Sequence, residues 1–393
     1  MSATAAPASA IRVDRADVEA AYDTARRFAV EELAPHIHDW DEAGTLPRSV
    51  YRRAAELGLL GMGYDESLGG SPASMAMRNA VSIALARFTA SGGLLASLFS
   101  HTIGLPPIAR HGNHELQQRI IPPVLRGEQI AALAITEPGG GSDVASLRTT
   151  ARRDGDAWVI DGEKTFITSG MRADWITVAV RTGEPGTRGS GGVSMIVVPG
   201  NTAGLQRTEL KKMGWWCSDT AHLRFDGVRV PLDHLVGDEG AGFKYIMSNF
   251  NSERLGMAAM ALGYAQACFD EALAWARERK TFGQPLVGHQ AIRHKLVDMR
   301  MRIEATQAWV DAVTARMDAG DEGADWVAQV CMLKNQATQT MQFCADQAVQ
   351  ILGGMGFMRG TRSERVYREV KVMMIGGGAE EIMKELAARQ LGL

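Results

Sequence analysis

Residues 242–283 read GFKYIMSNFNSERLGMAAMALGYAQACFDEALAWARERKTFG. Large apolar side chains recur in this segment at three- and four-residue steps, which is the spacing of one face of an α-helix. The apolar face comprises Phe243, Ile246, Met247, Phe250, Met257, Met260 and Tyr264. The pattern therefore predicts one long helix with a buried stripe, around which the other segments are arranged.

A charged residue interrupts this stripe. Counting 243, 246, 250, 253, 257 along the helix places Glu253 where an apolar side chain is expected. Burial of an unpaired carboxylate is costly, so such a group takes up a proton or finds a partner. From the residues alone two interpretations stay open. Glu253 is either one half of a core ion pair with Arg254 or another cation, or a general base kept away from water.

Composition narrows the class of protein. The chain has 393 residues, 46% apolar and 22% charged, which suits a globular protein of two or three domains. A formal net charge of −3 lacks the basic excess that nucleic-acid binding requires. No run of eighteen apolar residues predicts a membrane span, and the small, uncharged first ten residues predict a short disordered arm. Four cysteines without CxxC spacing favour a reducing cytoplasm, and the nine histidines lack the spacing of a metal site.

Changes between helix-type and strand-type residue patterns divide the chain into three domains. The predicted fold class is α+β multidomain. Residues 1–130 predict a helical N-terminal domain, 131–238 a middle β domain and 239–393 a C-terminal helical bundle. Within the β domain, Asp161-Gly162 predicts the turn of a hairpin inside Trp158–Thr168. The helices predicted after residue 240 span 243–279, 289–318, 324–352 and about 379–390.

The segment Thr136-Glu-Pro-Gly-Gly-Gly-Ser-Asp143 combines three glycines with hydroxyl groups. Glycines let backbone N–H groups approach an anion, and hydroxyls add further donors, so a phosphate-bearing ligand would suit this loop. The segment is neither a Walker A loop nor a GxGxxG motif. A plain surface turn stays an equal alternative.

Two further segments suggest ligand contacts. Arg279, Thr281 and Phe282 place a cation, a hydroxyl and an aromatic ring around Gly283, although basic residues there would also cap a helix. Gln350-Ile-Leu-Gly-Gly-Met-Gly-Phe357 is richer in glycine than a simple helix end requires, and close approach to a flat ligand would explain it.

Five motifs in one order resemble the acyl-CoA dehydrogenase family. They are AITEPGGGSD (134–143), KTFITS (164–169), MGWWCSDT (213–220), RKTFG (279–283) and QILGG (350–354). The resemblance covers essentially the whole chain. It implies a helical N-terminal domain, a middle β-barrel-like domain and a C-terminal four-helix bundle.

The resemblance also implies FAD as the cofactor. Thr136, Ser142, Phe166 and Thr168 would line the flavin and its phosphates, and Phe166 stands where many relatives carry tryptophan. A second group of residues would meet the FAD of a neighbouring subunit in a homotetramer: Arg279, Thr281, Phe282, Gln290, Gln350, Gly353 and Gly354. Ser142, Asn251, Arg254 and Gly377 would contact the acyl-CoA substrate.

The position of the base departs from the commonest family pattern. Most relatives carry a glutamate near the C-terminus, where this chain has Gly377 within Ile375-Gly-Gly-Gly-Ala379. A subgroup resembling isovaleryl-CoA and long-chain acyl-CoA dehydrogenases carries it in a Glu-Arg pair on the first long helix of the bundle, and Glu253 matches that position. Glu380 and Glu381 are weaker rivals, because the first turn of a helix favours negative charge without any catalytic role.

The implied reaction is α,β-dehydrogenation of an acyl-CoA to the trans-2-enoyl-CoA. Glu253 would take the α-proton, the β-hydride would pass to flavin N5, and the N–H of Gly377 would help polarise the thioester carbonyl. Electrons would leave for an electron-transfer flavoprotein. Alternatives are an oxygen-using acyl-CoA oxidase or flavin monooxygenase on the same fold, or a non-catalytic, DNA-associated binding member. The chain is shorter than acyl-CoA oxidases, which usually carry a further C-terminal domain. The retained Glu253 argues against a monooxygenase, which needs no α-proton abstraction, and the near-neutral charge argues against a DNA-associated member.

Overall fold

The computed structural model describes residues 13–183 and 189–393. The predicted N-terminal arm, residues 1–10, lies outside this range. Helices dominate up to residue 125: α1 (Arg15–Phe28), α2 (Ile37–Ala43), α3 (Arg48–Glu56), α4 (Met75–Thr89), α5 (Gly92–Leu98), α6 (His101–Gly104), α7 (Pro106–His111) and α8 (His114–Leu125). Side-chain caps start several of them. Asn113, for example, accepts a hydrogen bond from the N–H of Leu116 at the start of α8.

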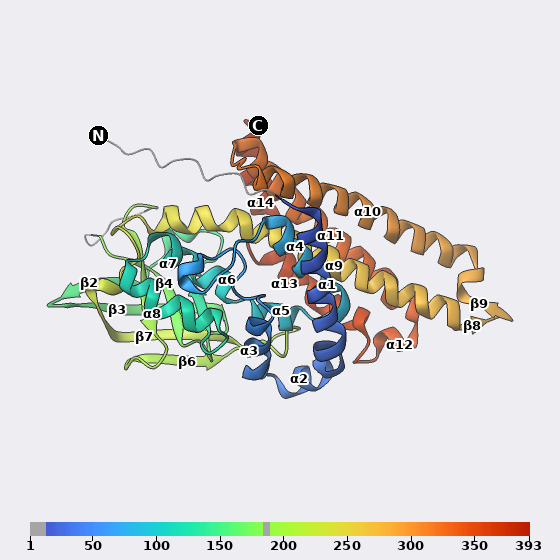
Figure 1. The fold of residues 1–393 in the computed structure, drawn as a ribbon, viewed down its shortest axis with the longest axis horizontal. Coiled ribbons are helices and arrows are strands. Elements are labelled where there is room, and N and C mark those ends of the chain that lie inside the picture. Colours follow the sequence, from blue (N-terminus) through green and yellow to red (C-terminus); the bar gives the residue numbers. More distant parts are fainter. Residues whose placement is uncertain (1–12, 184–188) are drawn as a thin grey trace. The chain divides into compact units, whose positions relative to one another are not determined.

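A single sheet occupies the middle of the chain (Figure 1). Its strands are β1 (Ala131–Ala134), β2 (Thr150–Asp154), β3 (Ala157–Thr168), β4 (Trp175–Arg181), β5 (Val193–Pro199), β6 (Leu205–Glu209) and β7 (Thr220–Pro231). The order is β1-β4-β2-β3-β7-β6, and β5 pairs with β4. Strand β1 runs parallel to β4, whereas β3 pairs antiparallel with both β2 and β7.

The hairpin predicted at Asp161-Gly162 is wrong. Strand β3 runs through both residues, and its register against β7 shifts between Ile160 and Gly162. A Cβ on Gly162 would lie 2.7 Å from Thr149, and its φ of 144° suits glycine alone. The glycine therefore serves a bulge with close backbone approach. The hairpin turn comes one strand earlier, at Gly155 between β2 and β3.

Long helices return after residue 241, as predicted: α9 (Gly242–Glu278), α10 (Gln290–Asp318), α11 (Ala324–Leu352) and α14 (Glu380–Leu391). Two further helices, α12 (Gly354–Phe357) and α13 (Arg362–Ile375), and a small hairpin of β8 (Lys280–Thr281) and β9 (Gln284–Pro285) were not predicted. The carboxylate of Glu271 in α9 accepts hydrogen bonds from the N–H groups of Arg362 and Ser363, which fixes the start of α13.

The chain forms two compact units. Of the described residues, one unit contains 13–36, Ala73–Gly92 and Arg254–Leu393, and the other contains Ile37–Pro72 and the described part of Gly93–Glu253. In the first unit α11 packs against α10, α13 and α14, and α1 packs against α4. Helix α9 contributes to both units. The domain limits predicted from the sequence, 1–130, 131–238 and 239–393, stay a prediction.

The buried stripe of α9 lies where the spacing places it. In the second unit Tyr245 and Ile246 belong to a core with residues of α8, β1, β4 and β5, and Phe243, Met247 and Phe250 pack against this core. Further along α9, Met257 and Tyr264 are buried. In residues 13–183 and 189–393, no helix combines the length and the apolar character that crossing a bilayer requires.

Candidate active site

The glycine-rich loop after β1 is held against β3. The N–H of Thr165 donates to the carbonyl of Thr136 at 2.8 Å, and a Cβ on Gly141 would lie 3.2 Å from the side chain of Thr136. By contrast, Gly139 and Gly140 have open space where a Cβ would be, and Ser142 is exposed. The structure therefore brings Thr136 and the loop that carries Ser142 next to the strand that carries Phe166 and Thr168.

A buried ion pair fixes this arrangement. Lys164 is fully buried, and its Nζ donates to Glu137 Oε1 at 2.8 Å and to the carbonyl of Ile135 at 2.9 Å. Burial lowers the pKa of Lys164 to about 8, although Glu137 beside it acts in the opposite direction. For Glu137 burial acts to raise the pKa, but the Lys164 ammonium and the N–H of Thr149 hold it below its ordinary value. Both groups are thus charged near neutral pH.

Phe166 and Thr168 follow this lysine on β3. The register of β3 against β7 shifts again between Lys164 and Ile167, and Phe166 takes a φ of 60°. Its ring is 68% exposed, whereas Thr168 is half-buried. A non-glycine residue in the left-handed region is strained and is often part of a functional site. The bulge therefore exposes an aromatic ring one residue after Thr165, whose N–H binds the carbonyl of Thr136.

Glu253 and Arg254 are neighbours in the middle of α9. Glu253 is half-buried, and its Oε2 atom is shielded from solvent. Arg254 is 5% exposed, and its Nε donates to the carbonyl of Gly377 at 2.9 Å. Asn251, one turn earlier, is half-buried. The structure thus ties one predicted substrate residue, Arg254, to another, Gly377.

A side chain at Gly377 would require Met257 to move. The φ of Gly377 is 66°, and a Cβ would lie 2.6 Å from Met257 Sδ. Gly378 follows with a φ of 115°. Among residues 13–183 and 189–393, no backbone carbonyl is found to accept from the N–H of Gly377. This position therefore offers a donor rather than a carboxylate.

We expect Gly377→Ala to destabilise the protein more than Gly320→Ala. Gly320 follows α10 with a φ of 83° and open space around its would-be Cβ, so an alanine there costs only the left-handed backbone, about 1–2 kcal/mol. At Gly377 the contact with Met257 adds an overpacking cost of about 1–3 kcal/mol. Thermal unfolding of both variants would measure the difference. Equal midpoints would mean that the turn relaxes to accommodate a side chain.

The rival carboxylates Glu380 and Glu381 lie at the start of α14. Glu380 Oε1 accepts hydrogen bonds from Gln339 at 2.8 Å and Lys384 at 2.7 Å. The contact with Lys384 holds the pKa of Glu380 below its ordinary value, which makes it a weaker base. Glu381 is exposed in the same turn. Both positions suit the role of N-terminal helix charges.

The segment after α9 is a β-hairpin rather than a simple helix cap. Phe282 and Gly283 form a two-residue turn between β8 and β9, with φ values of 50° and 81°. The ring of Phe282 is 97% exposed. Thr281 Oγ1 contacts His289 Nε2 at 3.2 Å, while Arg279 and Gln290 are exposed. A strained turn thus displays a bare aromatic ring.

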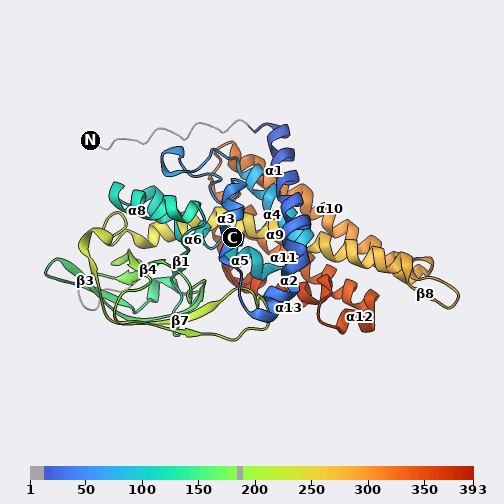
Figure 2. The same ribbon diagram turned by 60° about the horizontal axis from the view of Figure 1, so that its bottom comes forward.

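The second glycine-rich segment lies at the same end of the bundle as this hairpin. Both views place α12 and β8 there (Figures 1 and 2). Gln350 is exposed in the last turn of α11, Gly353 has a φ of 62° and a ψ of −132°, and a Cβ on Gly354 would meet open space. Phe357 is 88% exposed. The structure therefore groups the residues predicted to meet a neighbouring subunit's cofactor.

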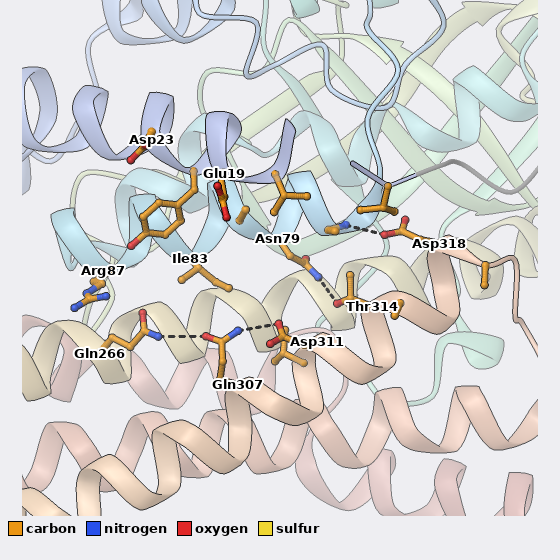
Figure 3. A pocket seen from close by; sticks show the side chains of 18 residues that line it. Glu19, Asp23, Asn79, Ile83, Arg87, Gln266, Gln307, Asp311, Thr314 and Asp318 are labelled. Carbon is orange, nitrogen blue, oxygen red and sulfur yellow. Dashed lines mark hydrogen bonds between the residues drawn. The ribbon is translucent and has the colours of Figure 1, made fainter. Parts of the chain in front are cut away.

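A separate cavity of about 860 Å³ contains none of the predicted site residues. It lies among α1, α4, α9 and α10, and the residues that line it all belong to the first unit (Figure 3). Asn79 donates to Thr314 at 2.8 Å, and the carboxylate of Asp318 caps the start of α4 through the N–H groups of Met75 and Ala76. These contacts stabilise the packing of α4 on α10.

One residue next to Gly377 was missed from the sequence. Lys334 of α11 is fully buried, and its Nζ donates to the carbonyls of Met374 at 3.0 Å and Gly378 at 2.8 Å. A signal was available, because Lys334 stands one turn after buried Cys331 and one turn before buried Thr338. It interrupts an apolar stripe in the same way as Glu253 interrupts that of α9.

The described residues fit FAD. Open glycine backbone beside Thr136 and Ser142 suits a pyrophosphate, and the exposed Phe166 ring next to Thr168 suits one face of a flavin. Among the residues with described positions, no cluster of His, Cys, Asp and Glu side chains could hold a metal ion.

Comparisons with known proteins identify the family of the chain. The sequence matches three domain models: acyl-CoA dehydrogenase N-terminal domain over residues 15–128, middle domain over 132–228 and C-terminal domain over 240–392. It is 34% identical to the long-chain specific acyl-CoA dehydrogenase of Mus musculus mitochondria, over 94% of this chain and 85% of the relative.

Solved structures give the same result. A probable acyl CoA dehydrogenase from Mycobacterium abscessus is 47% identical, with a TM-score of 0.91 over 95% of this chain and 98% of that chain. A glutaryl-CoA dehydrogenase from Mycobacterium smegmatis, solved in complex with FADH2, is 25% identical, with a TM-score of 0.87 over 96% and 95% of the two chains. The chain belongs to the acyl-CoA dehydrogenase family.

Proposed function

We propose that Glu253 is the general base of the FAD-dependent acyl-CoA dehydrogenation that this enzyme catalyses, and that Gly377 supplies a hydrogen-bond donor to the thioester carbonyl. The observation that carries the proposal is the division of roles between two positions. The chain has no carboxylate at residue 377, where a Cβ would lie 2.6 Å from Met257 Sδ, whereas Glu253 places a carboxylate with a shielded oxygen on α9.

The reaction needs a strong enough base and a polarised carbonyl. The α-proton of a thioester is too weakly acidic for a carboxylate unless the carbonyl oxygen is stabilised as negative charge develops on it. The backbone N–H of Gly377 is suited to this task, because it donates to no backbone carbonyl among the described residues. Glu253 then takes the proton at Cα, and shielding from water strengthens both interactions. Bound FAD supplies the acceptor for the hydride that leaves Cβ.

Cofactor contacts are proposed for two groups of residues. Thr136, Ser142, Phe166 and Thr168 would hold FAD on the chain's own sheet. A neighbouring copy would contribute Arg279, Thr281, Phe282, Gln290, Gln350, Gly353 and Gly354. The exposed rings of Phe282 and Phe357 support this second group, since large apolar side chains left bare at one end of a bundle indicate a surface that another molecule covers.

Substrate contacts and context are also proposed. The residues proposed to contact the acyl-CoA are Ser142, Asn251, Arg254 and Gly377. Arg254 would keep its hydrogen bond to the carbonyl of Gly377 while it contacts the substrate. A homotetramer is also proposed, in which a neighbouring subunit would cover the exposed side chains of Val297 and Met301 on α10. A cytoplasmic location is proposed because the four cysteines are buried and none is in a disulfide in the part of the chain that the structure describes. An electron-transfer flavoprotein is proposed as acceptor, and one solved relative, 29% identical, is named as an electron transferring flavoprotein of Acidaminococcus fermentans.

Anaerobic mixing with a panel of acyl-CoAs of increasing length and branching tests the proposed function. We expect at least one thioester to bleach the flavin absorbance and to yield the trans-2-enoyl-CoA. We also expect the reduced enzyme to pass electrons to an electron-transfer flavoprotein much faster than to oxygen. Rapid reoxidation by air would instead identify an oxygen-using enzyme on this fold.

A further inference from the structure

The turn that carries Gly377 is held by a buried lysine. Lys334 is 0% exposed, and its Nζ donates to the carbonyls of Met374 and Gly378, which lie on the two sides of Gly377. Removing an ammonium group from water is costly, and such groups persist in proteins where compensating interactions are provided. Two charge-assisted hydrogen bonds to one short turn therefore indicate that the position of this turn matters.

A second cation holds the same turn from another helix. Arg254 Nε of α9 donates to the carbonyl of Gly377, so the carbonyls of residues 374, 377 and 378 each accept from a buried cation. Asn335, next to Lys334 on α11, donates to the carbonyl of Glu380 at 2.9 Å and extends the attachment to the start of α14. Two helices of the first unit thus fix one backbone segment.

The glycines explain why external attachment is needed. Gly376, Gly377 and Gly378 have no side chains to restrict them, and the last two adopt φ values of 66° and 115°. Such a backbone has more accessible conformations than any other, so its N–H direction is poorly defined by local sterics. A donor aimed at a developing oxyanion is effective only when it is held in place beforehand.

We propose that Lys334 is a positioning residue for the dehydrogenation, which holds the Gly377 N–H where the thioester carbonyl is polarised. The inference rests on the proposed function, in which Gly377 is the donor. Lys334 acts through the turn and does not touch the substrate in this account. Its positive charge behind the turn also favours the negative charge that develops on the carbonyl oxygen.

The test compares Lys334→Met with Thr340→Val in the FAD-loaded enzyme. Thr340 lies on the same helix and is also buried, and its hydroxyl bonds Thr306 at 2.9 Å, far along α11 from the turn. The valine variant therefore controls for the loss of a buried polar contact in α11. We expect kcat to fall about 10- to 100-fold in Lys334→Met, with a smaller change in KM, because a donor displaced by about 1 Å loses that much.

Two readouts separate positioning from general structural support. The first probe is a 3-thiaacyl-CoA, a thioester that is not dehydrogenated and whose deprotonated form gives a charge-transfer band with FAD. The apparent pKa for its deprotonation on the enzyme should rise by about one to two units in Lys334→Met, which is a 10- to 100-fold weaker stabilisation of the anion. The second is hydrogen–deuterium exchange of residues 374–380, which should become faster. Both should be unchanged in Thr340→Val.

The outcomes distinguish this proposal from the function on which it rests. If Lys334→Met leaves the ligand pKa and the exchange rate at wild-type values, Lys334 is not a positioning residue, while the role of Glu253 stands. If Glu253→Gln retains turnover, the proposed base fails whatever Lys334 does. Should Lys334→Met not fold, Lys334→Gln is measured instead, because its side chain is shorter than that of lysine and carries no charge. A smaller shift in the same direction would support the proposal, and wild-type behaviour would overturn it, since neither the reach nor the charge of Lys334 would then matter.

Discussion

Glu253→Gln is expected to leave a yellow, folded enzyme whose flavin is not reduced by acyl-CoA. Glutamine keeps the size and most hydrogen-bonding capacity of glutamate, but it cannot accept the α-proton. Because neither Glu380 nor Gly377 offers an unengaged carboxylate in its place, we expect the rate of flavin reduction to fall by roughly 10⁴-fold. Glu380 is engaged with Lys384 and Gln339, and Gly377 has no carboxylate at all. Anaerobic stopped-flow absorbance at the flavin band measures the rate.

A matched control is available on the same helix. Glu278, the last residue of α9, is exposed, so Glu278→Gln makes the same chemical change without touching the proposed site. We expect wild-type reduction rates in this variant. A Glu253→Gln enzyme that still bleaches within tenfold of the wild-type rate would remove Glu253 from the mechanism.

Lys164→Met is expected to lower the free energy of unfolding by about 3–5 kcal/mol, because it leaves Glu137 buried without its cation. Glu137 is 8% exposed and also holds the N–H groups of Arg148 and Thr149, so it cannot turn out to solvent without releasing them. The loop of residues 137–143 should loosen with it, and FAD affinity should fall as well. Urea unfolding followed by tryptophan fluorescence, together with FAD titration, checks both effects.

The control for this prediction is a lysine–glutamate ion pair on the surface with the same distance between its nitrogen and oxygen atoms. Lys211 Nζ lies 2.8 Å from Glu209, but the lysine side chain is 88% exposed. Lys211→Met should leave stability unchanged within error, since exposed ion pairs contribute little. The double change Glu137→Gln with Lys164→Met should be less harmful than Lys164→Met alone. Equal costs for Lys164→Met and Lys211→Met would mean that burial does not strengthen the 137–164 pair.

Periodicity predicted the long elements well. The 3.6-residue pattern located α9, α10, α11 and α14 to within about two residues, because each helix buries one continuous apolar face. The same pattern identified Glu253 as anomalous. Helix α13 was missed although its signals were present. Thr361 caps the helix by accepting a hydrogen bond from the N–H of Glu364, and Val366, Val370 and Met373 follow at helical spacing.

Predictions of turns from short segments were less reliable, because the conformation of a turn depends on residues that are distant in the sequence. Asp161-Gly162 has the composition of a hairpin turn, yet the glycine is required by the approach of Thr149 from another segment. Likewise, the sequence could not show that Phe282-Gly283 is a hairpin tip rather than a helix cap. Short segments carry two interpretations, and tertiary contacts select between them.

For the site, the sequence identified candidate residues but not the contacts that the fold makes between them. Residues that matched family motifs could be identified as candidates, and the structure brings Thr136 beside β3 and Arg254 onto Gly377. Lys334 could not be assigned to Gly377 from spacing, because 43 residues separate them and only the packing of α11 on α13 and α14 brings them together. A lysine within an apolar stripe indicates a compensated charge, and the identity of its partners comes from the fold.

The most direct measurement is deuterium incorporation at Cα when an acyl-CoA substrate is incubated anaerobically with the FAD-loaded enzyme in D2O. Proton transfer to Glu253 and back requires that the wild type exchanges the α-hydrogen, that Glu253→Gln does not, and that Glu380→Gln behaves as the wild type. Exchange that persists in Glu253→Gln, or disappears in Glu380→Gln, would contradict the assignment of Glu253 as the base.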